Sequence, residues 1–156
     1  MKMTTALAKK RSDVFTKAKR SEVMRRILGR GNKDTELVLA KFFRQNKITG
    51  WQKQIEVRIQ KSEVRIFKVR PDFIFPKLKL AVFVDGCFWH GCPKHETKPK
   101  NNRAFWRRKF SRNKKRDVLV TRTLRRAGWR VLRVWEHELA KKNELRLFRR
   151  LQRALS

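Results

Sequence analysis

The chain has 156 residues, of which 44 are Lys or Arg and 13 are Asp or Glu, so its formal net charge is +31 at pH 7. Such a charge predicts a polyanionic partner, nucleic acid above all, because cations that neutralise phosphates release condensed counterions; a ribosomal-type or merely very soluble basic protein is the alternative. The length and the 40% of hydrophobic residues allow one packed domain and exclude a disordered chain. An apolar run no longer than Leu80–Val84 excludes a membrane-spanning helix, which needs about 20 such residues.

Residues 1–20 are basic and poor in large apolar side chains, so we expect a flexible arm followed by a single domain over 21–156. A short helix is predicted over Ser21–Gly29, with a serine cap and a glycine end. A second helix is predicted from about Asp34 to Gly50. No stretch near the N-terminus has the apolar length of a signal peptide, which favours a cytosolic location.

The middle of the chain is rich in predicted strands. Apolar and polar residues alternate over 55–59 and again over 64–66. Two further strands, Phe73–Phe75 and Leu80–Val84, are separated by the tight connection Pro76–Lys79. Because the second of them is apolar throughout, we expect a central strand that is buried on both faces.

The last third begins with an irregular segment, Gly86–Lys100. A long basic helix over Arg103–Ala127, a strand over Trp129–Trp135 and a helix over Asn143–Leu155 follow. The last helix is expected to bury Leu145, Phe148, Leu151 and Leu155. This order predicts an α/β fold, with a mixed central sheet flanked by helices.

Two carboxylates frame the predicted central hairpin. Asp72 stands at the start of one strand and Asp85 at the end of the next, so the hairpin brings them to one edge of the sheet. Hard oxygen ligands of this kind suit Mg²⁺, which phosphodiester hydrolysis uses. The spacing is that of the PD-(D/E)xK nuclease core, although Cys87 stands where that pattern has Lys. A strand-edge aspartate that only forms a turn is the alternative.

His90 lies in the loop just beyond the central strand. A histidine beside two acids can deprotonate a metal-bound water near neutral pH, so His90 is a candidate general base. From spacing alone, it can equally be a zinc ligand or a surface residue.

The pattern Cys87-x4-Cys92-x2-His95 suits tetrahedral Zn²⁺, and a loop with little core of its own benefits from a metal. His137 is the natural fourth ligand if the strand that ends at Trp135 runs beside the central strand. Two free thiols, or a small strained disulfide, are the alternatives. Two cysteines are too few for the disulfide framework of a secreted protein.

Aromatic and basic residues alternate around the irregular segment. Phe88 and Trp89 directly follow Cys87, and large apolar side chains on a rigid loop can wedge between base pairs. Helical aromatics usually pack inside, so we expect Phe105 in the core. The run Arg103–Arg116 holds eight basic residues and no acid, which favours phosphate contacts over a solvated helix face.

Residues Phe83–His90, which read FVDGCFWH, resemble the signature of the very short patch repair (VSR) endonucleases. Further segments agree in order: Lys19–Arg25, Arg70–Phe73, Phe105–Trp106, Gly128–Leu132 and Val134–Glu136. The resemblance covers about residues 15–142 and implies a restriction-endonuclease-like fold with a structural zinc site. It also implies an enzyme that cuts one DNA strand 5′ to the thymine of a T·G mismatch.

Residue by residue, the resemblance implies that Asp72 is the catalytic metal-binding aspartate and that Val84 offers its backbone carbonyl to the Mg²⁺ ion. Val84 stands where the family commonly has Thr, so any hydroxyl contribution is lost. Asp85 stands where some members have His and brings the site closer to a carboxylate pair. His90 matches the general base, and Glu36 corresponds to a supporting acid.

The resemblance also implies ligands and DNA contacts. A Cys2His2 zinc site is formed by Cys87, Cys92, His95 and His137, which leaves His90 as the base. The residues that intercalate beside the mismatch are Phe88, Trp89 and Trp106. Further DNA contacts are expected at Met24, Arg107, Arg108, Lys109 and Asn113.

The expected function is therefore Mg²⁺-dependent nicking of double-stranded DNA at a T·G mismatch, by a monomer in the bacterial cytosol, with mismatch-repair accessory proteins as further candidate partners. A related endonuclease without mismatch specificity and a non-catalytic zinc-stabilised nucleic-acid-binding module are the rivals. One departure from the family concerns residues 51–69, which are longer than expected. They predict an extra or extended hairpin that can alter contacts with DNA or a partner.

Overall fold

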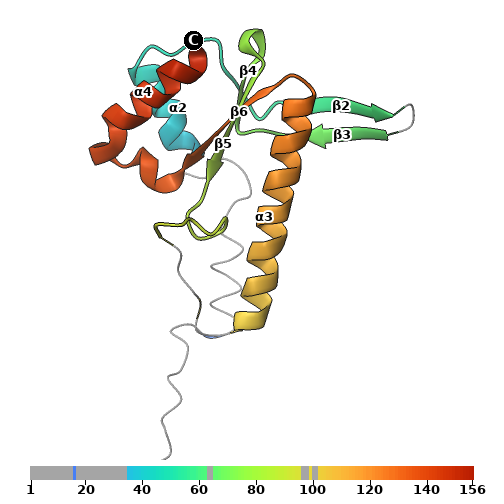
Figure 1. The fold of residues 1–156 in the computed structure, drawn as a ribbon. Coiled ribbons are helices and arrows are strands. Elements are labelled where there is room, and N and C mark those ends of the chain that lie inside the picture. The colour runs from blue at the N-terminus through green and yellow to red at the C-terminus, as the bar shows by residue number, and fades with distance from the viewer. Residues whose placement is uncertain (1–15, 17–34, 63–64, 96–98, 100–101) are drawn as a thin grey trace, which may run out of the picture.

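The computed structural model describes residues 16, 35–62, 65–95, 99 and 102–156 (Figure 1). The predicted arm, apart from Thr16, and the predicted helix over Ser21–Gly29 lie outside the described residues. The described elements are α2 (Glu36–Gln45), β1 (Gln52–Lys53), β2 (Val57–Ser62), β3 (Arg65–Val69), β4 (Phe73–Phe75), β5 (Leu80–Asp85), α3 (Arg103–Arg126), β6 (Arg130–Trp135) and α4 (Glu144–Leu155), with short 3-10 turns at Pro76–Leu78, Glu136–Leu139 and Lys141–Asn143.

A four-stranded mixed sheet in the order β1-β4-β5-β6 forms the centre of the molecule. β4 pairs antiparallel with β5, with Phe73 opposite Val82. β5 pairs parallel with β6, with Asp85 opposite Trp135. The predicted mixed α/β architecture is thus confirmed, and so is the predicted neighbourhood of the last strand and the central strand.

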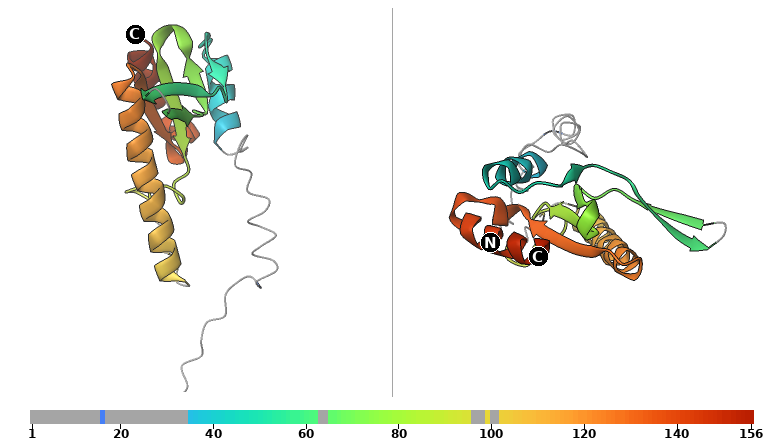
Figure 2. Two further views of the ribbon diagram at one scale, coloured as in Figure 1. Left: turned by 90° about the vertical axis from the view of Figure 1, so that its right-hand side faces the viewer. Right: turned by 90° about the horizontal axis from the view of Figure 1, so that it is seen from above.

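Alternate residues of these strands enter two separate cores, because side chains of a strand point to opposite faces. On one face, Leu80 and Val82 pack with apolar residues of α2 and α4. On the other face, Ala81 and Phe83 pack with Leu124 of α3. Figure 2 shows α3 on one side of the sheet and α2 with α4 on the other. The central strand is therefore covered on both faces, as its uninterrupted apolar sequence predicts.

The extra hairpin predicted for residues 51–69 is present as a separate two-stranded sheet, β2–β3. It projects sideways from the body of the protein in both Figure 1 and Figure 2. Val57 and Val69, at its base, are buried in the core beneath α3. The hairpin is thus anchored at one end and exposed at the other.

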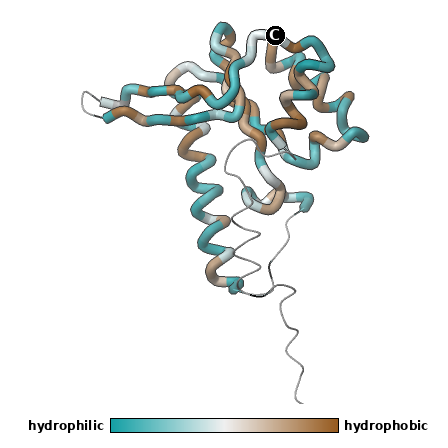
Figure 3. The backbone as a smooth tube through the Cα atoms, turned by 180° about the vertical axis from the view of Figure 1, so that it is seen from behind, coloured by the Kyte–Doolittle hydropathy of each residue, from teal (hydrophilic) through white to brown (hydrophobic). Residues whose placement is uncertain are grey.

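Two predictions about burial are wrong. Leu145 is 62% exposed, because the face of α4 that meets the sheet is centred on Leu147 and Leu151, which are both buried. Phe105 is 50% exposed, since the first half of α3 extends beyond the sheet. That half is mainly hydrophilic (Figure 3). In the described part of the chain, no helix combines the length and the apolar character needed to cross a membrane.

Candidate active site and metal centre

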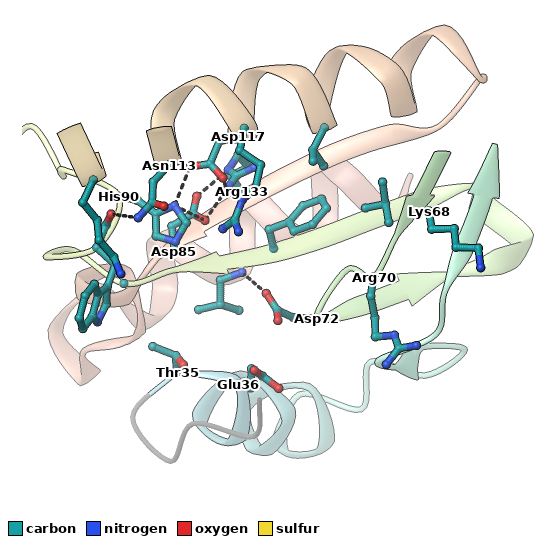
Figure 4. Close-up of a pocket in the computed structure, with 18 residues that line it drawn as sticks. Thr35, Glu36, Lys68, Arg70, Asp72, Asp85, His90, Asn113, Asp117 and Arg133 are labelled. Atoms are coloured by element: carbon teal, nitrogen blue, oxygen red, sulfur yellow. Dashed lines mark hydrogen bonds and ion pairs between the residues drawn. The ribbon is translucent and has the colours of Figure 1, made fainter. Parts of the chain in front are cut away.

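A cavity of about 670 Å³ is lined by residues of α2, the C-terminal end of β3, the adjoining ends of β4 and β5, and α3 (Figure 4). Acidic and basic side chains both line it. Its acids are Glu36, Asp72, Asp85 and Asp117, and its basic residues are Lys68, Arg70, His90, Lys109, Arg116 and Arg133. The cavity therefore gathers all four residues predicted to be catalytic.

Asp72 occupies the floor of the cavity just before β4. The antiparallel register of β4 and β5 brings it next to Val84, whose backbone N–H donates to Asp72 Oδ2 over 2.7 Å. Burial raises the pKa of Asp72 to about 6, and the negative charges of Glu36 and Asp85 raise it as well. The hydrogen bond from Val84 and the charge of Arg133 lower the pKa, but by less. A carboxylate held among other carboxylates in this way is a good candidate for binding a cation.

Glu36 approaches the same carboxylate from the first turn of α2. Its side chain is only 7% exposed, and Oε2 accepts a hydrogen bond of 2.8 Å from Gln54 Nε2. Lys53 Nζ lies 3.7 Å from the same oxygen. Glu36 is thus held by β1 and by the segment after it. Its negative charge acts on Asp72, so the predicted supporting acid lies near that carboxylate.

Asp85 lies in the cavity but is bound to a cation of the protein itself. Arg133 donates from Nε to Oδ2 and from Nη2 to Oδ1 of Asp85, both over 2.6 Å. Burial works against the charge of Arg133, but its hydrogen bonds with Asp85 and Asp117 outweigh that effect and raise its pKa. Asp85 is therefore the buried counter-ion of a half-buried guanidinium, an arrangement that sequence reasoning missed.

His90 contacts a second carboxylate that the sequence analysis did not single out. Its Nδ1 lies 2.6 Å from Asp117 Oδ2, and Asp85 Oδ1 is farther away at 3.7 Å. Burial raises the pKa of Asp117, but the hydrogen bond and charge of His90, with the charge of Arg133, bring it below its ordinary value. Asp117 is the sole acidic residue of α3, and that isolation is the signal that points to it.

Two cysteines and two histidines meet behind this site. Nδ1 of His137 lies 3.3 Å from Sγ of Cys87 and 3.5 Å from Sγ of Cys92, and Nδ1 of His95 lies 3.9 and 3.7 Å from the same sulfurs. All four candidate ligand atoms lie within 4.8 Å of one another. Ligands around a tetrahedral zinc ion lie about 3.3–3.8 Å apart, so the cluster is close to the size of such a site, and two thiols with two imidazoles are donors that zinc accepts.

The protein holds these ligands in place through the backbone. Cys87 N–H donates to Glu136 Oε2 over 2.9 Å, and Asn143 Nδ2 donates to the His137 carbonyl over 2.7 Å. Burial and the nearby His95 lower the pKa of His137, which favours the neutral imidazole that metals bind. Both cysteines are free, so the alternative of a disulfide does not apply.

The loop between the cysteines carries the predicted wedge residues. Phe88 packs edge-on against Trp89, Trp106 and Phe110, with ring centroids 5.0, 5.1 and 5.5 Å apart. Asn113 of α3 donates to the Trp89 carbonyl over 2.8 Å, so this predicted DNA contact fastens the loop to the helix. The aromatic cluster is thus assembled from two elements.

The remaining predicted DNA contacts lie along α3. Arg107, Arg108 and Lys109 are all exposed, and Lys109 Nζ lies 5.7 Å from the centre of the Trp89 ring. Met24 lies outside the described residues.

Comparison with known proteins agrees with this arrangement. A family model described as DNA mismatch endonuclease Vsr matches residues 12–98, which is more than half of the chain. The chain is 40% identical to the Type II nicking enzyme V.NmeDIP of Neisseria meningitidis serogroup C, over 83% of this chain and 81% of that protein. It is 35% identical to the DNA mismatch endonuclease Vsr of Escherichia coli, over 86% and 80%. A shorter match, 56% identical, joins it to the Type II nicking enzyme V.NaeI of Lentzea aerocolonigenes over 46% of this chain and 43% of that protein.

Proposed function

The chain belongs to the DNA mismatch endonuclease Vsr family, and on this premise we propose that it is a Mg²⁺-dependent endonuclease that nicks one strand of duplex DNA 5′ to the thymine of a T·G mismatch. The observation that carries the proposal is the meeting of a buried carboxylate cluster, around Asp72, with the His90–Asp117 pair in one cavity. A bacterial cytosolic monomer is the form we propose, since one chain supplies every residue of this site.

Asp72 and the backbone carbonyl of Val84 would hold the magnesium ion. When bound, that ion polarises the phosphate and offsets the charge that develops on the leaving oxygen. The Val84 N–H keeps the Asp72 carboxylate in one orientation. Glu36, fixed by Gln54, adds negative charge beside it. Because Arg133 neutralises Asp85, we assign Asp85 to holding this guanidinium in the cavity rather than to binding the metal.

His90 would accept the proton of the attacking water. If its Nδ1 carries a hydrogen that is donated to Asp117, Nε2 is left free to act as the base. The water oxygen then bonds to phosphorus, one P–O bond of the backbone breaks, and the leaving oxygen takes a proton from solvent. Asp117 is a positioning residue in this step, because it sets the tautomer and orientation of the imidazole.

The zinc-type cluster and the aromatic cluster serve the same reaction. His90 lies between Cys87 and Cys92, so a Zn²⁺ ion held by the four ligands would make the base-bearing loop rigid. Phe88, Trp89 and Trp106 would enter the base stack beside the mismatch. Opening a base step costs a few kcal/mol and least at a mispaired base, which supplies part of the selectivity.

The direct test is a nicking assay on matched duplexes that differ in one base. With Mg²⁺, the wild type should nick the T·G duplex 5′ to the thymine roughly hundredfold faster than the T·A duplex, and EDTA should stop the reaction. Equal rates on both duplexes would instead identify a related endonuclease without mismatch specificity. Binding without any nicking would identify a non-catalytic module.

Replacing Asp117 by Asn should lower the single-turnover nicking rate by roughly 10²–10⁴, because Asn can hold His90 in the wrong tautomer. DNA affinity should change little, and Asp117→Glu should recover part of the rate.

The ion pair between Asp117 and His90 also affects the stability of the fold. Because the pKa of Asp117 is lowered on folding, its contribution is present above the ordinary carboxyl pKa and is lost as pH falls through the folded value. Urea unfolding of the wild type and of Asp117→Asn from pH 3 to 7 measures this contribution. A nicking rate of Asp117→Asn close to that of the wild type would rule out Asp117 as the residue that positions His90.

A further inference from the structure

The β2–β3 hairpin has two chemically distinct faces. Directly opposite pairs alternate between them, because the register sets Val57 against Val69, Arg58 against Lys68, and Ile59 against Phe67. The apolar pairs pack on the core beneath α3. The other face holds exposed cations, and it has no role in the proposed nicking mechanism.

On this cationic face, like charges stand directly opposite each other in the Arg58–Lys68 pair. Such a pair destabilises a hairpin, so its presence calls for an anion that the hairpin itself does not supply in full. Among the described residues of the hairpin and its flanks, Glu56 is the acid that meets these cations: its carboxylate lies 2.9 Å from Arg58 and 3.5 Å from Arg70. The hydrogen bond from Arg58 lowers the pKa of Glu56. Burial has the opposite effect, but the charges of Lys68, Arg58 and Arg70 act with the hydrogen bond and keep the pKa below its ordinary value. In the part of the hairpin that the structure describes, this single carboxylate does not balance Arg58, Lys68 and Arg70, so their face stays positive.

The cationic face continues into the candidate active site. Lys68, Arg70 and Asp72 occupy alternate positions of the chain, and all three side chains line the same cavity (Figure 4). Lys68 lies in β3, and Arg70 lies in the short segment that leads from β3 to Asp72, so the chain itself carries the two cations up to the catalytic carboxylate. Two cations that share a cavity with Asp72 can contact the phosphates next to one that reaches Asp72.

We propose that the β2–β3 hairpin is a phosphate-binding arm, in which Arg58, Lys68 and Arg70 contact the DNA backbone beside the nicked position. The inference rests on the proposed function, because it takes duplex DNA as the substrate. Phosphate contacts of this kind set the register and orientation of the protein on the duplex and carry no sequence information.

The test compares two double variants of the full chain with equal charge changes. Arg58→Gln/Lys68→Gln alters the arm but spares Arg70, which lies beside the catalytic centre. Arg149→Gln/Arg153→Gln is the control, because these exposed cations lie on α4, across the sheet from the hairpin. Affinity for a T·G duplex is measured at a series of salt concentrations.

The arm variant should bind roughly tenfold more weakly, and the slope of log affinity against log salt should fall by about 2, one unit for each lost phosphate contact. Its nicking rate at saturating DNA should fall less than its affinity. Its melting temperature should change little, because removing the like-charge pair offsets the loss of the exposed Arg58–Glu56 ion pair. The control should keep both the affinity and the slope of the wild type.

A set of duplexes with single neutral methylphosphonates then locates the contacts. The wild type should lose affinity at positions beside the nick where the arm variant loses none. Equal salt slopes for the arm variant and the control, or identical methylphosphonate profiles for wild type and arm variant, would overturn the inference. If the wild type neither binds nor nicks the duplex, the proposed function itself has failed.

Discussion

Asp72→Asn should abolish nicking and make the metal-free protein more stable. The asparagine oxygen can still accept the Val84 N–H, so the fold is kept, but the charge that would hold Mg²⁺ is gone. Losing several kcal/mol of electrostatic stabilisation at the phosphate predicts a rate that falls by roughly a thousandfold or more. Duplex affinity without Mg²⁺ should change little, since the arm, α3 and the aromatic cluster are untouched.

The stability gain follows from the raised pKa of Asp72. Folding raises the pKa of this carboxyl from 3.8 to about 6, so the folded protein binds the proton more tightly. The contribution of Asp72 to the free energy of unfolding should therefore fall as pH rises through that window, by up to about 3 kcal/mol. Asp72→Asn should not show this fall.

Thermal unfolding at pH 8 without added Mg²⁺ is the measurement. The variant should melt at a higher temperature than the wild type, and adding Mg²⁺ should raise the melting temperature of the wild type only. Glu144→Gln, an exposed carboxylate-to-amide change on α4, is the matched control and should nick normally. A nicking Asp72→Asn variant would rule out the assignment of Asp72 as metal ligand.

The local parts of this site are predictable from sequence. Asp72 and Val84 come together because two strands with a four-residue connection form a hairpin. His137 reaches Cys87 because a strand after a long helix pairs parallel with the central strand, which is the expected crossover topology. The proximity of the four cysteine and histidine side chains is thus a confirmed prediction, whereas the identity of the metal stays a prediction.

The parts that sequence reasoning missed depend on side-chain geometry between distant elements. Asp117 meets His90 only because the loop after β5 folds back along α3, 27 residues later in the chain. Arg133 stands between the buried residues Leu132 and Val134 of β6, the position of an outward-facing residue in a strand. The sequence pattern therefore gives no reason to expect Arg133 in a catalytic cavity. The exposure of Phe105 and Leu145 was missed for a related reason: helical periodicity predicts an apolar face, but the length and rotation of the helix against the sheet decide which residues that face covers.

Removing the metal of the Cys2His2 cluster should have the other large effect. We expect the purified protein to contain about one Zn²⁺ per chain, and a strong chelator should release it with a loss of several kcal/mol of stability and of all nicking. The loop over Cys87–Cys92 has few apolar contacts except its aromatic cluster, while Cys92 is fully buried. Without the metal, these two thiols and two imidazoles, whose Sγ and Nδ1 atoms lie 3.3–3.9 Å apart, lose the bonds to the ion that would join the loop to His137.

Single substitutions separate the ligand role from simple packing. His95→Ala should lower zinc content and melting temperature, because His95 is exposed and contributes little packing of its own. Its exposed neighbour offers the matched control, Lys94→Ala, which should keep the zinc, the melting temperature and the nicking rate. Cys92→Ala should be worse than His95→Ala, since it removes a ligand and leaves a gap in a buried position. A wild type that is metal-free, folded and active would contradict the zinc proposal. The rigidity of the loop that carries His90 would then have to come from its aromatic cluster and from its hydrogen bonds with Asn113, Asp117 and Glu136.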